Sequence, residues 1–342
     1  MTTPQLKPIN QQVVAIVGAS SGIGRAAALQ FAEKGAKVAV AARSRSGLDS
    51  LVNEIKAMGG DAIAIPADVA DFDQVKAIAD KTVDYFGRLD TWVHTAATAV
   101  FARFEQHTPE EFRRVIDVNL MGQVYGAMVA LPHLRREGRG AFIAIGSVEG
   151  HRSLPLQSAY SCSKHAVEGF LDSLRVELIH DQVPISITNV MPSTINTPFY
   201  NNGLTKLGRK PKGVPPFYQP ELVAQSILYA AENPVRDLIV GDSGRVLDVA
   251  QKFVPGLIDA ALAVIAVPGE HSTEPKAESA PNNLYEPVEE DNRVRGDFDN
   301  QVFPSFLEWF DWNPTAKWGT VAAGLAGLAL VAARSLGGDK SA

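Results

Sequence analysis

Residues 13–24 read VVAIVGASSGIG and carry the clearest structural signal in the chain. Residues 13–17 form a short apolar, β-branched run, which predicts a buried strand, and residues 25–34 have the pattern of a helix. Three glycines lie between the two. Glycines in that place allow a tight turn and a close approach of the backbone to a pyrophosphate, and the amino end of the helix favours an anion. A purely structural turn is the alternative interpretation.

The alternation of strand and helix continues as far as residue 250. Strands are expected at residues 13–17, 37–42, 62–67, 91–94, 141–145, 184–190 and 237–240, with helical segments between them. These strands are continuous apolar runs, which is typical of strands buried on both faces of a sheet. We therefore expect an α/β fold, a Rossmann-type doubly wound parallel sheet of about seven strands with helices on both faces.

The C-terminal extension divides into three parts by composition. Residues 251–267 are apolar, and we expect a helix packed on the domain formed by residues 1–250. Residues 268–313 contain eleven acidic and three basic side chains with several prolines, which favours a flexible linker. Residues 314–342 are rich in Ala and Gly, and the uncharged run 318–333 is slightly short for a membrane span. For that run, membrane insertion, docking on the domain and a subunit interface are alternatives.

The overall composition excludes several classes of protein. The 342 residues include one Cys, which excludes an intrachain disulfide and a Cys-based zinc site, and we expect no metal centre. The formal net charge of −6 gives no global electrostatic support to nucleic-acid binding. The first residues, MTTPQLKPINQQ, lack the pattern of a secretory signal, so we expect a cytoplasmic protein.

The ends of the second and third strands indicate which cofactor is bound. An acidic residue after the second strand would accept hydrogen bonds from a ribose hydroxyl of NAD, but this chain has Arg43 there. A guanidinium favours a 2′-phosphate through charge-assisted hydrogen bonds, so we expect NADP(H) in preference to NAD(H). Asp68 and Val69 follow the third strand, where an adenine could lie, and a helix cap is the alternative for Asp68.

Four polar residues form a candidate catalytic group. Tyr160 and Lys164 lie four residues apart and project from one face of a predicted helix. A neighbouring lysine cation stabilises a tyrosine phenolate and lowers the phenol pKa from its usual value of about 10. Ser147 follows the fifth strand, at the sheet edge where ligands bind, and could hold a substrate oxygen. Asn119 lies within a predicted helix, an unfavourable place for Asn, so we expect it to have a specific partner.

With these motifs in this order and spacing, residues 10–250 resemble the short-chain dehydrogenase/reductase family. The resemblance implies hydride transfer between NAD(P)(H) and an alcohol/carbonyl pair. It implies that Tyr160 is the general acid or base, that Lys164 binds the nicotinamide ribose, and that Ser147 orients the substrate oxygen. Asn119 would hold a water that completes a proton relay through Lys164. The cofactor-binding residues implied are Gly18, Ser20, Ser21, Gly22, Ile23, Gly24, Arg43, Asp68, Val69, Ala96, Tyr160, Lys164, Pro192, Ile195 and Thr197.

Three positions depart from the family pattern. Val17 stands where the family has a Thr that braces the glycine turn, and Ser193 stands where it has a Gly. Residues 94–97, HTAA, replace Asn-Asn-Ala-Gly, and we expect His94 to be a structural substitute for the first Asn. None of these changes removes a candidate catalytic residue.

Residues 198–220 lie where the family carries a lid over the substrate. They contain Phe199, Tyr200, Phe217 and Tyr218 and several basic side chains. These residues favour a fairly apolar substrate, with a negative charge on the substrate as one option. A solvated surface loop is the alternative.

The sequence therefore predicts an NADP(H)-dependent oxidoreductase that acts on a small alcohol or carbonyl compound by a Ser-Tyr-Lys-Asn mechanism. The alternative is a catalytically silent NADP(H)-binding sensor or scaffold, which the long extension and the altered segments suggest. The resemblance also implies a homo-oligomer. No nucleic-acid partner is expected, and membrane contact through the C-terminal segment is left open.

Overall fold

The computed structural model describes residues 4–313, 315–320, 322–324 and 326. They form two compact units, one ending at Pro304 and one beginning at Ser305. The second unit contains the short helix α11 (Glu308–Trp312) and further helical residues at 315–320 and 322–324. Most of the run 318–333 lies outside the described residues, so the alternatives predicted for it are left as they stand.

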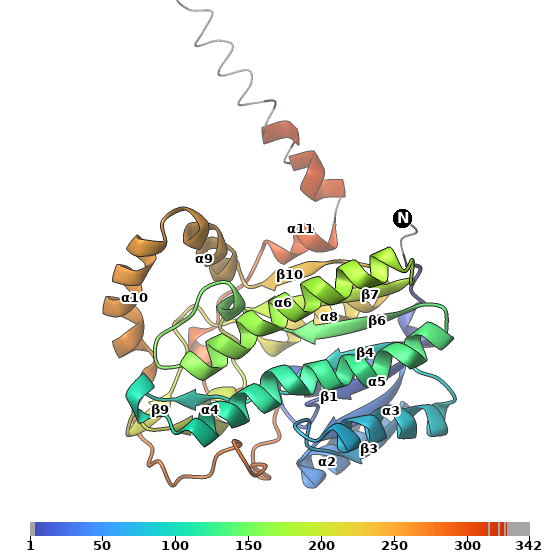
Figure 1. The fold of residues 1–342 in the computed structure, drawn as a ribbon, viewed down its shortest axis with the longest axis horizontal. Coiled ribbons are helices and arrows are strands. Elements are labelled where there is room, and N and C mark those ends of the chain that lie inside the picture. The colour runs from blue at the N-terminus through green and yellow to red at the C-terminus, as the bar shows by residue number, and fades with distance from the viewer. Residues whose placement is uncertain (1–3, 314, 321, 325, 327–342) are drawn as a thin grey trace, which may run out of the picture. The chain divides into compact units, whose positions relative to one another are not determined.

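The first unit is built on a sheet of seven strands in which all neighbouring pairs are parallel. The spatial order is β10 (Asp237–Val240), β7 (Ile185–Pro192), β6 (Gly140–Ile145), β4 (Thr91–His94), β1 (Val13–Val17), β2 (Lys37–Ala42) and β3 (Asp61–Pro66) (Figure 1). These are the strands that the sequence predicts, and the Rossmann-type fold is confirmed. The chain runs outward from β1 to β3 and then returns to β4 on the other side of β1. The carboxyl ends of the neighbouring strands β1 and β4 are therefore the switch point at which such sheets bind ligands.

Helices cover both faces of the sheet, as predicted (Figure 1). One face carries α1 (Gly22–Glu33), α2 (Arg45–Ala57) and α8 (Pro220–Glu232), and the other carries α3 (Phe72–Phe86), α5 (Gly122–Arg136) and α6 (Ser158–His180). Successive side chains of a strand point to opposite faces. Val14 and Ile16 of β1 accordingly belong to the first core, and Ala15 and Val17 belong to the second.

A wide helical turn separates α4 (Pro109–Ile116) from α5. Thr108 and Glu111 form a capping box that starts α4, and Asp117–Met121 form a π-helical turn at its end. Such turns are frequent at functional sites. Of the described helices, the run Pro109–Arg136 alone has the length and apolar composition of a membrane span. Half of its most apolar window is buried inside the protein, which is what a core helix of this fold requires.

The apolar segment after the sheet is helical, but it does not pack as we expected. α9 (Asp242–Phe253) and α10 (Pro255–Gly269) follow β10. On α10 the side chains of Leu257 and Val264 are 67% and 74% exposed, and Ala266 is its buried residue. A helix that is apolar on all sides cannot bury every side against one surface, and the described residues leave most of α10 uncovered.

Residues 271–304 also differ from the flexible linker that we expected. β11 (His271–Pro275) pairs in antiparallel orientation with β9 (Arg209–Pro211), a strand of the predicted lid. Leu284 is fully buried among Val100, Ala102 and their neighbours, and Phe298 is buried against Phe217. Residues 271–304 are polar on average, but the burial of Leu284 and Phe298 attaches them to the rest of the first unit.

Candidate active site

The turn between β1 and α1 requires its glycines. Gly18 has a φ of +87°, and a Cβ there would lie 2.5 Å from the Ala96 nitrogen. A Cβ on Gly24 would lie 2.2 Å from the carbonyl oxygen of Gly18. The hydroxyl of Thr95 donates to the carbonyl oxygens of Val17 and Gly18 at 2.8 and 3.1 Å. Thr95 thereby braces the turn. Val17 cannot do so through its side chain, because valine has no hydroxyl.

The amino end of α1, which we expect to favour an anion, has one of its N–H groups occupied by the chain itself. The N–H of Gly22 donates to the carbonyl oxygen of Arg293 at 3.0 Å. A part of the C-terminal segment therefore already uses one of the donors at this helix terminus.

Arg43 lies at the carboxyl end of β2 and contacts the same segment. Its guanidinium donates to the main-chain oxygens of Asn283 at 2.5 Å and Tyr285 at 2.8 Å. Burial lowers the pKa of Arg43, and the nearby carboxylate of Asp68 opposes that shift. Two of the five guanidinium N–H groups are used in this way, which leaves others for a ligand.

Asp68 lies after β3 and is held in place by two donors. It accepts hydrogen bonds from Arg114 at 2.6 Å and from the N–H of Ala70 at 3.0 Å. The residue that caps α3 is Asp71. The helix-cap alternative for Asp68 is therefore wrong.

One cavity at the carboxyl edge of the sheet joins these parts. Its empty volume is about 1410 Å³, part of it open to solvent. The walls include Gly18, Ser20, Ser21, Gly22, Ile23, Gly24, Arg43, Asp68, Val69, Ala96, Ser147, Tyr160, Lys164, Pro192, Ile195 and Thr197. These are all the residues that the sequence nominates for the site except Asn119. The fold therefore brings the predicted site residues, which are spread along the chain from Gly18 to Thr197, around one cavity.

Tyr160, Lys164 and Ser147 meet at one end of the cavity. The ammonium of Lys164 lies 5.4 Å from the centroid of the Tyr160 ring and donates to the carbonyl oxygen of Ile145 at 2.7 Å. Ser147 starts the short helix η4 (Val148–Gly150), and its hydroxyl is close enough to the Tyr160 phenol to lower the phenol pKa. The phenol and the serine hydroxyl can therefore face the same ligand atom.

Burial controls the protonation of this group. It raises the pKa of Tyr160, an effect that the carboxylate of Glu149 reinforces and the Ser147 hydroxyl opposes. Burial also lowers the pKa of Lys164 to about 8. It raises that of Glu149 to about 7, against the hydrogen bond that Ser161 donates to Glu149 at 2.6 Å. The pKa of Tyr160 is therefore raised, where the sequence led us to expect that Lys164 would lower it, and Tyr160 keeps its proton at neutral pH, as a general acid must.

Asn119 lies in the π-helical turn, behind the cavity wall. Its side-chain oxygen accepts from the N–H of Thr98 at 2.8 Å, and its amide donates to the Thr98 carbonyl at 2.9 Å and to Ser163 Oγ at 3.1 Å. Thr98 and Ser163 are thus the specific partners expected for a buried Asn. The water relay through Lys164 stays a prediction.

His94, at the end of β4, does not line the cavity. Its ring is fully buried, and neither nitrogen has a hydrogen-bond partner among the described residues. Burial lowers its pKa to about 3, so the ring is neutral. This environment agrees with the structural role that we expected.

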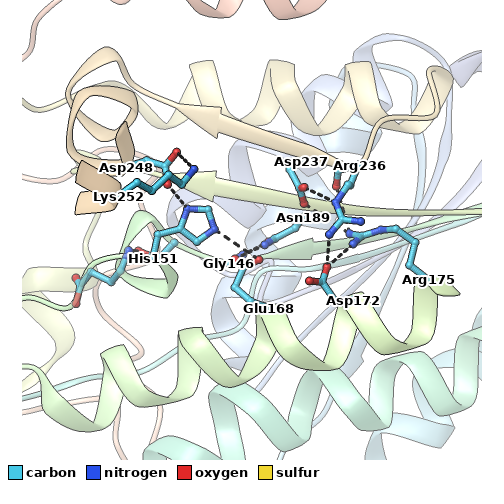
Figure 2. A network of polar contacts seen from close by, with 12 residues as sticks. Gly146, His151, Glu168, Asp172, Arg175, Asn189, Arg236, Asp237, Asp248 and Lys252 are labelled. Carbon is cyan, nitrogen blue, oxygen red and sulfur yellow. Dashed lines mark hydrogen bonds and ion pairs between the residues drawn. The ribbon is translucent and has the colours of Figure 1, made fainter. Parts of the chain in front are cut away.

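A polar network supports the loop that carries Ser147 (Figure 2). Asn189 on β7 accepts from the N–H of Gly146 at 3.1 Å and donates to Glu168 on α6 at 2.5 Å. His151 lies between Glu168, 3.9 Å away, and Asp248 of α9, 2.7 Å away. The network therefore connects α6, β7 and α9 to the main chain just before Ser147.

This network predicts a pH-dependent contribution to stability. Glu168, with support from Asp248, raises the pKa of His151. A raised folded-state pKa stabilises the fold fully below the unfolded value of about 6.5, and the stabilisation is lost as the pH rises through the folded value. We expect the wild type to lose more unfolding free energy than His151→Gln between about pH 6 and pH 9 in urea titrations. The control is His165→Gln, an exposed histidine of α6. Parallel pH profiles for wild type and His151→Gln would contradict the prediction.

The aromatic residues of 198–220 divide into two groups. Phe199 and Tyr200 line the cavity. Phe217 and Tyr218 are 0% and 2% exposed and belong to the core, so they are not part of a lid surface.

Two of the four basic residues of the same segment, Lys206 and Lys210, are paired within the chain. Lys206 lies 2.8 Å from Glu111 and 3.4 Å from Glu278, and Lys210 lies 2.5 Å from Asp297. Acidic residues of the C-terminal segment supply two of these partners. None of the four basic side chains lines the cavity, so they give no support to a negatively charged substrate.

Several cavity residues escaped the sequence reasoning. They are Ser44, Glu149, Asn202, Asn283, Pro287, Val288, Asp291 and Asn292. The last five belong to the segment that composition assigned to a linker. No periodicity or motif distinguishes them, so the sequence contained no signal for their position.

Comparison with known proteins gives consistent matches. A family model described as short chain dehydrogenase matches residues 12–206. The oxidoreductase YxnA of Bacillus subtilis is 38% identical over 287 residues, which cover 83% of this chain and 81% of that protein. The 11-beta-hydroxysteroid dehydrogenase-like protein 3 of Arabidopsis thaliana is 37% identical over 191 residues, 55% of this chain and 60% of that protein.

A solved structure resembles the first unit. It is an alcohol dehydrogenase from the archaeon Thermococcus sibiricus, complexed with 5-hydroxy-NADP. The TM-score is 0.60 and the sequence identity 25%, over 67% of this chain and 95% of that one.

Proposed function

This chain belongs to the short-chain dehydrogenase family and is an oxidoreductase, and from that premise we propose that it transfers hydride between NADP(H) and a largely apolar alcohol or carbonyl compound. The observation that carries the proposal is the meeting of Tyr160, Lys164 and Ser147 at one end of a cavity whose other end is the glycine turn.

The residues around the cavity fit a dinucleotide. The turn packs tightly against Thr95 and Ala96 because neither Gly18 nor Gly24 carries a Cβ, and a pyrophosphate could approach the main chain of this turn. Ser20, Ser21 and Ile23 would face the phosphates, Asp68, Val69 and Ala96 the adenosine, and Pro192, Ile195 and Thr197 the nicotinamide. When bound, the nicotinamide supplies or accepts the hydride.

Tyr160 moves the proton in this proposal. During carbonyl reduction its O–H donates a proton to the substrate oxygen, and during alcohol oxidation the phenolate takes that proton back. The hydroxyl of Ser147, which contacts the phenol, holds the same oxygen in place. Both groups therefore act at a single atom of the substrate.

Lys164 stabilises the phenolate that forms. Its ammonium is fixed by the carbonyl oxygen of Ile145 and lies 5.4 Å from the Tyr160 ring centroid. In this proposal the cation acts against the burial that raises the pKa of Tyr160, because charges interact more strongly in a buried site than in water. Asn119 donates a hydrogen bond to Ser163, which lies on α6 next to Lys164. The water relay that Asn119 would complete is part of the proposal.

The substrate end of the cavity favours an apolar compound with one polar group. Phe199 and Tyr200 form its walls, while Glu149 and Asn202 are its polar members. The hydroxysteroid dehydrogenase-like relative and the alcohol dehydrogenase neighbour are consistent with an alcohol or carbonyl substrate. A cytoplasmic location and a homo-oligomeric state are also part of the proposal.

The experiment that tests the proposal is a panel of carbonyl compounds incubated with the protein and NADPH. We expect loss of the absorbance of the reduced nicotinamide with at least one apolar ketone or aldehyde. Binding of NADPH with no turnover on any member of a broad panel would favour the sensor or scaffold instead.

The preference for NADP(H) is tested at Arg43. Removal of its guanidinium in Arg43→Ala should weaken NADPH binding by roughly 10- to 100-fold and NADH binding by about twofold at most, because only NADPH offers a 2′-phosphate. Calorimetric titration measures both affinities. The matched control is Arg45→Ala, since Arg45 is 71% exposed and pairs with Asp49. Equal losses for the two cofactors would refute the preference.

A further inference from the structure

Part of the C-terminal extension forms a wall of the cofactor cavity. Asn283, Pro287, Val288, Asp291 and Asn292 all line it. Their segment therefore lies within reach of a dinucleotide bound there.

The segment is attached at both ends of that wall. At one end Asn283 accepts from the hydroxyl of Thr98 at 2.8 Å, and its carbonyl oxygen accepts from Arg43 at 2.5 Å. At the other end the carbonyl oxygen of Arg293 accepts from the N–H of Gly22 at 3.0 Å. The segment thus runs from the end of β2 to the glycine turn.

Between these attachments a carboxylate points at α2. Glu289 accepts hydrogen bonds from the hydroxyl of Ser44, at 2.7 Å, and from that of Ser46. Ser44 is the N-cap of α2, and its oxygen also accepts from the N–H of Gly47 at 3.1 Å. The hydrogen bonds from Ser46 and Ser44 lower the pKa of Glu289, so it is an anion at neutral pH.

The groups around Glu289 are those that would bind a 2′-phosphate. Two serine hydroxyls and the amino end of a 13-residue helix directly follow Arg43 in the chain. Phosphate oxygens would accept from these hydroxyls as the carboxylate does, and Arg43, which precedes Ser44 in the chain, would add a cation. The carboxylate of Glu289 therefore stands in for the anion that this place suits.

We propose that Glu289 is a cofactor-specificity residue, whose carboxylate occupies the place of the 2′-phosphate, so that NADP(H) displaces it from Ser44 and Ser46 and NAD(H) does not. The inference rests on the proposed NADP(H)-linked function. The preference of the enzyme is then a balance between Arg43, which attracts the phosphate, and Glu289, which competes with it.

The test uses two nucleotides that differ in the 2′-phosphate alone. The affinities of 2′,5′-ADP and 5′-AMP are measured by calorimetry on the full chain, without substrate or turnover. Glu289→Gln removes the competing charge and should tighten 2′,5′-ADP about tenfold while 5′-AMP changes by less than about twofold. The control is Glu290→Gln, which makes the same charge change one residue further along; among the described residues Glu290 has no hydrogen bond or ion pair. It should alter neither affinity.

The outcomes separate this inference from the proposed function. If wild type prefers 2′,5′-ADP to 5′-AMP but Glu289→Gln behaves like Glu290→Gln, the role of Glu289 is wrong and the NADP(H) proposal survives. Weaker binding of 2′,5′-ADP to Glu289→Gln would also overturn it, because Glu289 would then help to position the serines. If no variant distinguishes the nucleotides, there is no 2′-phosphate site and both ideas fail.

Discussion

Replacing Tyr160 with Phe should lower kcat by about 10³-fold on whichever carbonyl compound the wild type reduces, because the variant has no acidic proton to give to the substrate oxygen. The change removes one oxygen atom from a ring that packs against Phe199 at a centroid distance of 5.4 Å. Packing and cofactor binding should therefore be retained. Steady-state kinetics and calorimetric titration with NADPH measure the two properties separately.

The control for this variant is Tyr85→Phe. Tyr85 is 61% exposed and does not line the cavity, so the loss of its hydroxyl should leave kcat unchanged. If Tyr160→Phe turned over as fast as Tyr85→Phe, another group would have to supply the proton. The proposed role of Tyr160 would then be wrong.

The second large effect is expected at Gly24. An added Cβ would lie 2.2 Å from the carbonyl oxygen of Gly18 and 2.5 Å from the Thr95 hydroxyl, so the turn must shift. We expect Gly24→Ala to lower the unfolding free energy by about 3 kcal/mol and to abolish measurable NADPH binding, since the same turn would hold the pyrophosphate. Urea denaturation and NADPH titration measure the two effects.

Gly169 provides the matched control, because it is also a helical glycine. It lies in the interior of α6, and a Cβ there meets no atom within 4 Å. Gly169→Ala should stabilise the fold by about 0.5–1 kcal/mol through its better helix propensity. A Gly24→Ala variant that folded as stably as Gly169→Ala and bound NADPH normally would show that the turn tolerates a side chain.

The parts of the site that could be predicted depend on local patterns. The strand, glycine turn and helix from Val13 onward are contiguous, and the four-residue spacing of Tyr160 and Lys164 places both on one face of a helix whatever surrounds it. The alternation of strands and helices then implies a parallel sheet and a ligand site at its carboxyl edge. Residues far apart in the chain could therefore be assigned to one cavity from sequence.

The C-terminal segment could not be predicted, for a physical reason. Its acidic composition and prolines are those of a disordered linker, and two buried apolar side chains, Leu284 and Phe298, do not change that average. Its contacts with Arg43 use main-chain oxygens, which any residue offers. Its carboxylates Glu278 and Asp297 pair with Lys206 and Lys210, which lie about 70 to 90 residues earlier in the chain. No local sequence pattern predicts such contacts.

Isotope transfer tests the proposed direct transfer of hydride from NADPH to the substrate carbon. The protein is incubated with NADPH that carries deuterium at the transferable C4 position and with a carbonyl compound from the active part of the panel. We predict that the alcohol product carries one deuterium on its carbinol carbon for each NADPH oxidised, and that Tyr160→Phe binds the labelled cofactor but forms almost no labelled alcohol. Saturable NADPH binding with no deuterium in any product would contradict the claim.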